Sequence, residues 1–501
     1  MPLLQQLIPA LYQGAVLLLI LYGLFVLTSI SLFFIYRARH DWPESSTPPE
    51  QWPAVTLQIP IYNERRVAER VVRAVAALDY PSDKLQIQVL DDSTDGTSAM
   101  LARLVAALRQ SGHDCHYLHR THRQGYKAGA LAHALNSATG EFVGIFDADF
   151  VPHPQWLKQT VPALMAHPEL AFVQTRWGHM NRGQNFLTAA QALALDGHFV
   201  VEQQARSASQ FMQNFNGSGG LWRRRAIDEA GGWQSDTVTE DLDLAYRAQL
   251  AGWRGSYINS IEAAAELPPV ITGFKRQQRR WAKGSIQTLR KLALPILRSN
   301  QRWNKKLYAL AHMGGYAFHL PLLTMLLLTL PLAMLPSYHL PLSFMGSVSM
   351  IFSAAPFVMF ALAQYTLVGG RGLRRLWALP VLAILFMGLS PAIASAVLSG
   401  LRHSGGVFER TPKQGRGPRR MALPGKITLS ELWPETLVFG YALLSLMVIR
   451  ATGHWVLAPL PVLFLLGSGL ALSLEFSEYL AVRRYRHPTR RSRLARPGDI
   501  G

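Results

Sequence analysis

Long apolar runs without charge constrain the fold of this chain more than any other feature. One run lies near the start, at residues 14–36. Further runs follow residue 300, at about 307–335, 343–368, 376–401, 435–449 and 455–475. A helix of about 20 apolar residues is long enough to span the hydrocarbon core of a bilayer. The sequence therefore predicts membrane helices on both sides of a central water-soluble part. The first run lacks the features of a signal peptide and is expected to remain as an anchor.

The basic residues predict how these helices are oriented. They follow the first run and form later clusters, at Arg37, Arg39, His40, 302–306, 371–375, 402–420 and 483–496. Basic residues beside membrane helices favour the cytoplasmic side. All clusters lie on that side if the later runs form two hairpins and 376–401, interrupted by Ser390-Pro391, is re-entrant or interfacial. We therefore expect a multi-pass protein of the inner (plasma) membrane with five crossings and a cytoplasmic central domain.

The formal net charge of +19 indicates an anionic partner. Nucleic acid is a poor candidate, because the basic residues gather beside the apolar runs, where they face lipid headgroups. We expect contact with membrane lipid and none with nucleic acid. Cys115 is the single cysteine, so an intramolecular disulfide is excluded. Its side chain is expected to be a small buried hydrophobe.

The stretch between the membrane segments alternates short apolar runs with helical patterns. Strands are predicted at 55–60, 85–90, 115–118, 142–146 and 170–174. Helices are predicted around 64–78, 97–110, 127–138 and 155–166. This alternation predicts an α/β, Rossmann-like domain with a mainly parallel sheet covered on both faces. The expected organisation is an N-terminal membrane helix, a Pro-rich linker, this domain with an interfacial helix, a C-terminal membrane region and a basic cytoplasmic tail, at 1–37, 38–53, 54–300, 301–480 and 481–501.

Two aspartates follow the fourth predicted strand. Because side chains two apart on a strand share a face, Asp147 and Asp149 are expected to point the same way. Paired carboxylates suit a hard cation, and Mg²⁺ or Mn²⁺ would bridge them to a diphosphate. A solvated acidic turn is the simpler alternative. The position after a strongly apolar strand favours the metal.

Other polar residues lie at similar strand ends, where ligands of parallel sheets bind. Asp91 and Asp92 follow the second strand and are suited to a base or ribose, while Thr97 is expected to cap the next helix. Lys127 follows a glycine at a predicted helix start and is suited to phosphate. A surface lysine is the simpler alternative for that position.

The segment Thr239-Glu240-Asp241 precedes another predicted helix. A threonine N-cap followed by acids that favour the helix dipole is a sufficient local account. A general base fits the same position, because a helix start holds a carboxylate firmly within reach of a proton.

Together these motifs resemble those of membrane-embedded family 2 glycosyltransferases. Tyr62-Asn63-Glu64, Asp91-Asp92-Ser93, Asp147-Ala148-Asp149, Thr239-Glu240-Asp241 and Gln277-x-x-Arg280-Trp281 occur in the order of that family, and the last motif is similar to its processive, cellulose synthase-like branch. Phe215-Asn216-Gly217-Ser218 and Phe408-Glu409-Arg410-Thr411-Pro412-Lys413 look closest to bacterial relatives of plant mannan and glucan synthase-like proteins. The resemblance implies a GT-A-type fold. Because the tail after residue 475 is short and basic, regulation by a cyclic-dinucleotide sensor domain is not expected.

The resemblance also implies roles for individual residues. Asp241, with Glu240, would act as the catalytic base. The donor would be bound by Tyr62, Glu64, Asp91, Asp92, Lys127, Asp147 and Arg280. The acceptor would be bound by Phe215, Asn216, Gly217, Ser218, Gln277 and Trp281. Asp147 and Asp149 would hold Mg²⁺ or Mn²⁺ with the diphosphate, and Trp281 would stack on the terminal acceptor sugar.

The expected function is inverting, processive β-glycosyl transfer from a nucleotide sugar to a growing polysaccharide, with translocation across the membrane. UDP-glucose is the first guess for the donor and GDP-mannose the second. The alternatives are a single transfer to a membrane lipid, giving a glycolipid, and a basic membrane scaffold or channel with a degenerate domain. Aromatics inside the C-terminal helices would favour a glycan channel, and the candidates are Trp303, Tyr308, Tyr316, Phe318 and Tyr365.

Overall fold

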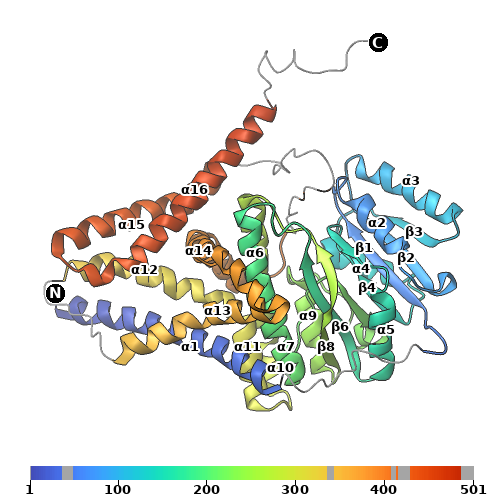
Figure 1. Cartoon of the computed structure of the whole chain (residues 1–501), viewed down its shortest axis with the longest axis horizontal. Helices are drawn as coiled ribbons and strands as arrows, with labels where there is room; N and C mark the ends of the chain where they lie inside the picture. The colour runs from blue at the N-terminus through green and yellow to red at the C-terminus, as the bar shows by residue number, and fades with distance from the viewer. Residues whose placement is uncertain are drawn as a thin grey trace, which may run out of the picture.

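The computed structural model describes residues 2–36, 49–335, 344–407, 413, 415 and 429–486. Figure 1 shows a sheet with its helices on one side of the molecule and a group of long helices on the other. The strands are β1 (Val55–Ile61), β2 (Leu85–Asp91), β3 (Asp114–His119), β4 (Phe142–Ile145), β5 (Phe150–Pro152), β6 (Leu170–His179), β7 (Gly220–Arg223) and β8 (Arg254–Ala265). The helices that accompany them are α2 (Ala68–Ala76), α3 (Thr97–Gln110), α4 (Tyr126–Leu135), α5 (Trp156–Ala166), α6 (Phe186–Asp196), α7 (Gln204–Ala208), α8 (Arg224–Glu229) and α9 (Glu240–Leu250).

Within the described residues the strands form one mixed sheet, in the order β3-β2-β1-β4-β7-β6-β8-β5. The half that carries β3, β2, β1 and β4 is parallel throughout, as the alternation of strands and helices predicts. In the other half, β7 runs antiparallel to both of its neighbours, and β5 runs antiparallel to β8. The α/β fold class is therefore confirmed, but the sheet is more mixed than the sequence predicts.

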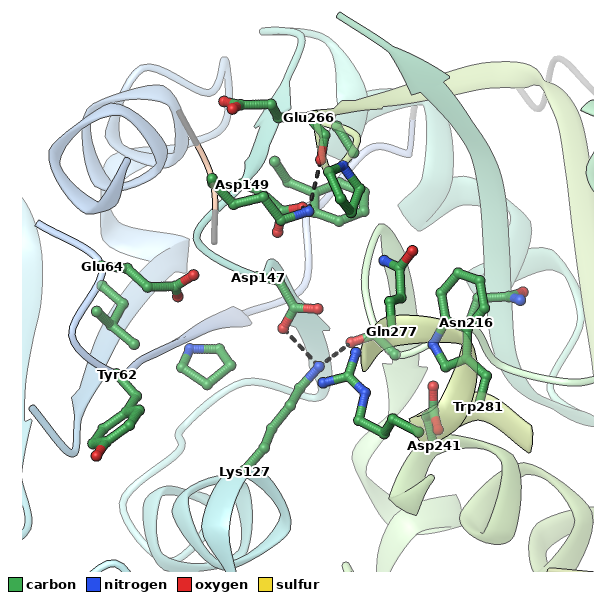
Figure 2. A pocket seen from close by; sticks show the side chains of 18 of the residues that line it. Tyr62, Glu64, Lys127, Asp147, Asp149, Asn216, Asp241, Glu266, Gln277 and Trp281 are labelled. Carbon is green, nitrogen blue, oxygen red and sulfur yellow. Dashed lines mark hydrogen bonds and ion pairs between the residues drawn. The ribbon is translucent and has the colours of Figure 1, made fainter. Parts of the chain in front are cut away.

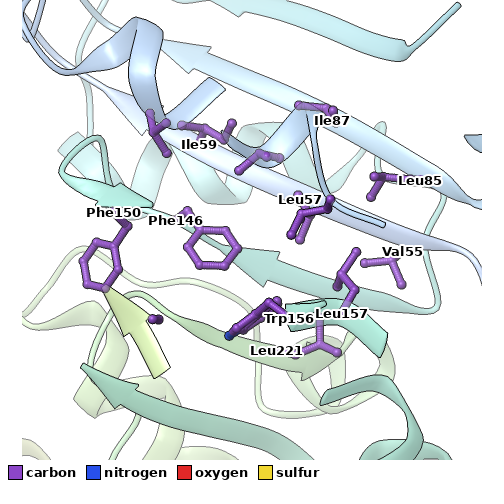
Figure 3. Close-up of a cluster of buried hydrophobic side chains, with 14 of the residues drawn as sticks. Val55, Leu57, Ile59, Leu85, Ile87, Phe146, Phe150, Trp156, Leu157 and Leu221 are labelled. Carbon is purple, nitrogen blue, oxygen red and sulfur yellow. The ribbon is translucent and has the colours of Figure 1, made fainter. Parts of the chain in front are cut away.

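Strand β1 shows why this sequence forms a central strand. Val55, Leu57 and Ile59 point into an apolar core against α2, α3 and α5, together with Phe146 and Trp156 (Figure 3). The intervening Thr56 and Gln58 are buried on the opposite face, where they bond to glutamines of β2. Thr56 Oγ1 donates to Gln86 Oε1 at 2.8 Å, and Gln58 Nε2 donates to Gln88 Oε1 at 3.0 Å. These bonds satisfy polar groups that would otherwise be costly to bury.

Five helices in the described part of the chain are long and apolar enough to cross a membrane. They cover Gln5–Tyr36, Gly315–Ala333, Phe352–Arg402, Trp433–Thr452 and Pro459–Arg483. The span Phe352–Arg402 contains parts of two helices, α13 (Phe344–Val368) and α14 (Leu379–Arg402). The other spans correspond to α1 (Pro2–Tyr36), α12 (His319–Ala333), α15 (Trp433–Thr452) and α16 (Pro459–Arg486). The predicted run at 307–335 is divided in the structure, because α11 (Trp303–Met313) ends before α12 begins.

Helix α14 occupies the segment whose path the basic residues left open. It is one uninterrupted helix through Pro391, so the chain does not turn back there and a re-entrant loop is wrong. Both of its ends meet the domain that contains the sheet. Just before α14, Arg375 bonds to Gln364, which in turn donates to Asp196 at the end of α6. Just after it, His403 accepts a bond from Gln287. Because α14 also lies within the candidate membrane span Phe352–Arg402, its interfacial position stays a prediction.

Helix α10 (Ile271–Arg298) joins the sheet domain to the long apolar helices and carries the Gln277-x-x-Arg280-Trp281 motif. Its first turn is held by a carboxylate from α16. Glu478 accepts hydrogen bonds from the backbone N–H groups of Ile271 and Thr272 and from the Thr272 hydroxyl. A carboxylate at a helix N-terminus satisfies free N–H groups and the helix dipole together. The position of α10 is thereby tied to the C-terminal helices.

Candidate active site

A pocket lies at the carboxyl ends of β1 and β4, beside the starts of α4, α9 and α10. Residues from segments far apart in the sequence share its wall (Figure 2). The predicted site residues that line it are Tyr62, Glu64, Asp92, Lys127, Asp147, Asp149, Asn216, Gly217, Glu240, Asp241, Gln277, Arg280 and Trp281. The topology of the sheet explains the convergence, since the ends of parallel strands meet at one edge.

Lys127 lies at the centre of the acidic side of this pocket. Its Nζ is 2.6 Å from Asp147 Oδ1 and 3.7 Å from Glu240, and it donates to the Gly217 carbonyl at 2.8 Å (Figure 2). Burial alone would lower the pKa of Lys127, but the charges of Asp147 and Glu240 outweigh it and raise that pKa. Lys127 therefore stays charged, and it is a buried ion-pair partner rather than a surface lysine.

Asp241 stands in the second position of α9. Its Oδ1 accepts the backbone N–H of Leu242 at 2.8 Å. Burial raises the pKa of Asp241, the neighbouring charge of Glu240 raises it further, and Lys127 and Arg280 oppose the change, with a resulting pKa of about 7. A carboxylate that titrates near neutral pH is suited to accept a proton in a reaction. Thr239 occupies the N-cap position, but its side chain makes no capping bond, so the capping interpretation is wrong.

Asp147 and Asp149 lie in the turn that follows β4 and not on the strand itself. Strand β4 ends at Ile145, and Phe150 N donates to Asp147 O at 3.0 Å across the turn. Both carboxylates nevertheless face the pocket (Figure 2). Ser218 Oγ accepts the backbone N–H of Asp147 at 2.9 Å and so holds the turn in place. Both side chains reach the same pocket, but the prediction that they share one face of a strand is wrong. A tight turn after β4 brings them there instead.

Each of these aspartates is paired with a lysine. Asp147 contacts Lys127, and Asp149 Oδ2 lies 2.5 Å from Lys413 Nζ. No group of three or more His, Cys, Asp or Glu side chains suited to a metal occurs among the described residues. Two carboxylates still fit Mg²⁺ or Mn²⁺, because such ions are commonly bound by one or two carboxylates together with substrate phosphates.

The two aspartates after β2 differ in their environment. Asp91 is fully buried and lies outside the pocket wall, where it accepts bonds from the Tyr117 hydroxyl at 2.7 Å and from the backbone N–H of Ser93 at 2.9 Å. Asp92 lines the pocket and takes both Nε and Nη2 of Arg120, at 2.8 and 2.6 Å. Contact of Asp91 with a donor remains a prediction that the burial of its carboxylate does not favour.

Two other predicted positions are buried in packing. Phe215 has 1% of its surface exposed and stacks edge-on with Phe172 and near Trp222, although it reaches the cavity described below. Ser218 is fully buried beneath Asp147. Thr97 does not cap α3, because Gly96 occupies the N-cap position and Thr97 is the first residue of the helix. The side chain of Asp95 accepts the Thr97 N–H at 2.9 Å.

Several pocket residues were not predicted from the sequence. The guanidinium of Arg123 lies 3.5 Å from the ring centroid of Tyr62, which makes a cation–π pair on the donor side. Glu266 accepts Lys413 Nζ through its backbone carbonyl at 2.7 Å and pairs with Arg70 at 3.1 Å. The motif that ends in Lys413 was a signal for that lysine. Glu266 and Arg123 stand in no motif, and their position follows only from the fold.

A second cavity, of about 290 Å³, continues from this pocket toward the long helices. Both share residues around Trp281, which include Trp177, Asn216, Thr239, Asp241 and Gln277. Farther in, the cavity is lined by aromatic side chains that include Tyr22 of α1, Phe274 of α10, Phe386 of α14 and Phe318, which directly precedes α12. Of the predicted channel aromatics, Tyr316 and Phe318 line it, whereas Trp303 and Tyr365 are largely exposed and Tyr308 packs against Ser29.

The sheet and its helices have a GT-A-type fold, and the pocket brings the acidic motifs together at one edge of the sheet. Residues 53–284 match the family model described as glycosyltransferase like family 2, and this segment is a family 2 glycosyltransferase domain. Within this class, the chain is similar to cellulose synthase-like proteins of plants. It is 41% identical over 280 residues to glucomannan 4-beta-mannosyltransferase 2 of Arabidopsis thaliana, covering 55% of this chain and 52% of that one.

A second relative gives the same result. Glucomannan 4-beta-mannosyltransferase 1 of Oryza sativa subsp. japonica is 39% identical over 295 residues, which is 56% of each chain. The chain thus matches about half the length of these curated relatives. Among solved structures, it shares its fold with a mannosyltransferase from Pyrobaculum calidifontis in complex with GDP-Man and Mn²⁺, with a TM-score of 0.53 at 23% identity over 79% of this chain and 97% of that one.

Proposed function

We propose that this protein is an inverting β-glycosyltransferase that extends a mannan or glucomannan chain from a nucleotide sugar. The observation that carries the proposal is the continuity of an acidic pocket with an aromatic cavity at Trp281. A donor pocket alone would fit any family 2 enzyme. A long cavity lined by aromatic rings suits a chain of sugars, because the C–H faces of sugars pack on such rings.

The side chains present support a single displacement. Asp241 is placed to take the proton of the acceptor hydroxyl, and its pKa of about 7 suits that role. Lys127 and Arg280 contribute positive charge beside the position of the leaving diphosphate. Asp147 and Asp149 would hold Mg²⁺ or Mn²⁺, which when bound neutralises diphosphate charge. A single displacement inverts the anomeric centre and gives a β-linked product from an α-linked donor.

The relatives reverse the expected order of donors. They are named glucomannan mannosyltransferases, and the solved structure of similar fold contains GDP-Man. GDP-mannose is therefore the first candidate for this chain, and UDP-glucose becomes the second. We further propose that the chain is processive and passes its product through the aromatic cavity, with the sheet domain and Lys413 on the cytoplasmic side of the inner membrane.

The first experiment is a donor panel. Purified full-length protein in lipid nanodiscs is incubated with radiolabelled GDP-mannose, GDP-glucose, UDP-glucose and UDP-GlcNAc, and the products are sized and digested with β-mannanase. We expect incorporation from GDP-mannose into mannanase-sensitive polymer. A single sugar on a lipid would instead establish the glycolipid alternative. Incorporation from no donor would refute enzymatic activity and leave a scaffold or channel.

Replacing Trp281 by Ala tests whether the cavity holds the acceptor. The indole lines both the donor pocket and the aromatic cavity. We therefore expect GDP-mannose binding to stay within a few-fold of the parent and long polymer to be lost, because the aromatic surface on which the acceptor packs is removed. The matched control is Trp303→Ala, because Trp303 is 64% exposed and lines neither cavity. Parent-length polymer from the Trp281 variant would show that Trp281 is only a membrane-interface anchor.

A further inference from the structure

A buried polar cluster borders the aromatic cavity beside Asn216. Its centre is the π-helical segment Gly197–Gln203, which lies between α6 and α7. The wider turn of a π-helix is uncommon and is often found at functional sites. It brings His198 and Glu202 to the cavity wall and Gln203 behind them. His312, from α11, reaches the same cluster from the opposite side.

The hydrogen bonds of this cluster run in one direction. Fully buried Arg206 donates to Gln203 Oε1 at 2.5 Å, and Gln203 Nε2 donates to Asn216 Oδ1 at 2.7 Å. With its oxygen engaged, the Asn216 amide presents Nδ2 to His198 Nε2, at 3.2 Å. An amide nitrogen only donates, so His198 Nε2 must offer a lone pair. The His198 proton is then on Nδ1, which lies 3.1 Å from Glu202 Oε2.

The groups that surround His198 come from several elements. The negative charge of Glu202, on the same π-helical segment as His198, is paired with Arg206 of α7 at 3.6 Å. From α11, His312 Nδ1 lies 2.8 Å from Glu202, and burial together with Arg206 lowers the pKa of His312 to about 4. Tyr22 from α1, Tyr246 from α9 and Tyr308 from α11 are uncharged at neutral pH, and Asp241 is the acid across the cavity. The Nε2 lone pair of His198 is therefore assigned by the bond from the Asn216 amide.

We propose that His198 is a positioning residue for the acceptor. Through its Nε2 lone pair, neutral His198 fixes the Asn216 amide so that the other Nδ2 hydrogen is available to a hydroxyl of the glycan beside Trp281. The inference rests on the proposed function, since it takes Asn216 to border the acceptor. When His198 gains a proton, Nε2 becomes a donor, the bond from Asn216 is lost, and the amide is no longer held.

The test measures acceptor binding without turnover. Full-length protein carrying Asp241→Asn, which also removes the titration of that acid, is placed in nanodiscs with fluorescent β-(1→4)-mannohexaose. The Kd is measured at pH 7.5 and 5.5. We expect binding about 10-fold weaker at pH 5.5, equivalent to about 1.4 kcal/mol. Binding of GDP to each variant serves as the check that the protein is folded.

Substitutions at position 198 separate positioning from packing. His198→Gln keeps an acceptor and a donor at its end without titrating, so we expect a Kd within about 3-fold of the parent at pH 7.5 and no change at pH 5.5. His198→Leu removes the bond to Asn216 and should bind about 10-fold more weakly at both pH values. His312→Gln is the matched control, because it touches Glu202 but not Asn216, and the pH effect should remain.

Three results would overturn the inference. The first is a Kd for mannohexaose that does not change between pH 7.5 and 5.5 in the Asp241→Asn protein with His198 intact. The second is an absence of mannohexaose binding, and the third is an unchanged pH effect in His198→Gln. Failure of the proposed function is distinguishable, because sugar transfer is measured separately with Asp241 intact. If mannohexaose binding depends on pH but no sugar is transferred, the proposed activity is refuted and the positioning role of His198 stands. If sugar is transferred but binding does not depend on pH, the proposed activity stands and the role of His198 is refuted.

Discussion

Replacement of Asp241 by Asn is expected to lower sugar transfer about 10²–10⁴-fold, the usual contribution of a positioned general base. Asn keeps the size of the side chain and an oxygen to accept the Leu242 N–H, so the start of α9 should persist. GDP-mannose binding, measured by calorimetry, should stay within a few-fold of the parent. The matched control is Asp228→Asn on α8, whose side chain is 57% exposed and distant from the pocket wall.

The same carboxylate should set the dependence of the rate on pH. The folded pKa of Asp241 is raised to about 7 by burial and by Glu240, so the group is protonated and inactive as a base at lower pH. The transfer rate should therefore rise with pH and level off above about pH 8. If the Asn variant transferred sugar at nearly the parent rate, with the same pH profile, Asp241 would be only a structural residue at the helix start.

Replacement of Gly217 by Ala is expected to cost about 100-fold in transfer, because a misplacement of about 1 Å in a catalytic group has an effect of that size. Gly217 has φ of +80°, and a Cβ atom there would lie 2.6 Å from Asp241 Oδ2 and 3.4 Å from Lys127 Nζ. The methyl group would have to displace the Asp241 carboxylate. The left-handed backbone adds about 1–2 kcal/mol of strain, which should lower the thermal midpoint by only a few degrees.

Gly183→Ala provides the control for that experiment. A Cβ atom at Gly183 would meet nothing within 4 Å, so transfer and thermal midpoint should both match the parent. An active Gly217→Ala protein would show that the carboxylate of Asp241 is free to move without loss of function. A folded Gly217→Ala protein should still bind GDP, so loss of GDP binding would identify a variant that does not fold.

The sequence was sufficient for the elements whose signal is local. Strands β1 and β2 alternate apolar residues with Thr or Gln, and α3 has a helical pattern over its full length, so all three were predicted within a residue or two. Strands β5, β7 and β8 were missed. The first two are only three and four residues long, and their antiparallel pairing depends on partners far away in the chain. A pattern of a few residues does not distinguish such a strand from a loop.

The motifs determined which residues belong near one another, but not how each side chain is used. Asp91 and Asp92 are adjacent in the sequence, yet Asp91 is bonded to Tyr117 and Ser93 whereas Asp92 lines the pocket, because β2 ends at Asp91 and Asp92 belongs to the loop that follows. Lys127 was predicted for phosphate, and the fold surrounds it with Asp147 and Glu240.

The tertiary structure alone decided the longest-range contacts. Lys413 reaches Asp149 across 264 positions, and the order of hydrogen bonds from Arg206 to His198 depends on a π-helical turn that no sequence pattern indicates. By itself the sequence determined the class of domain, its acidic motifs and its membrane helices, since these depend on composition and spacing. The identity of each side chain's partner depended on packing, because burial and charge balance are properties of the assembled fold.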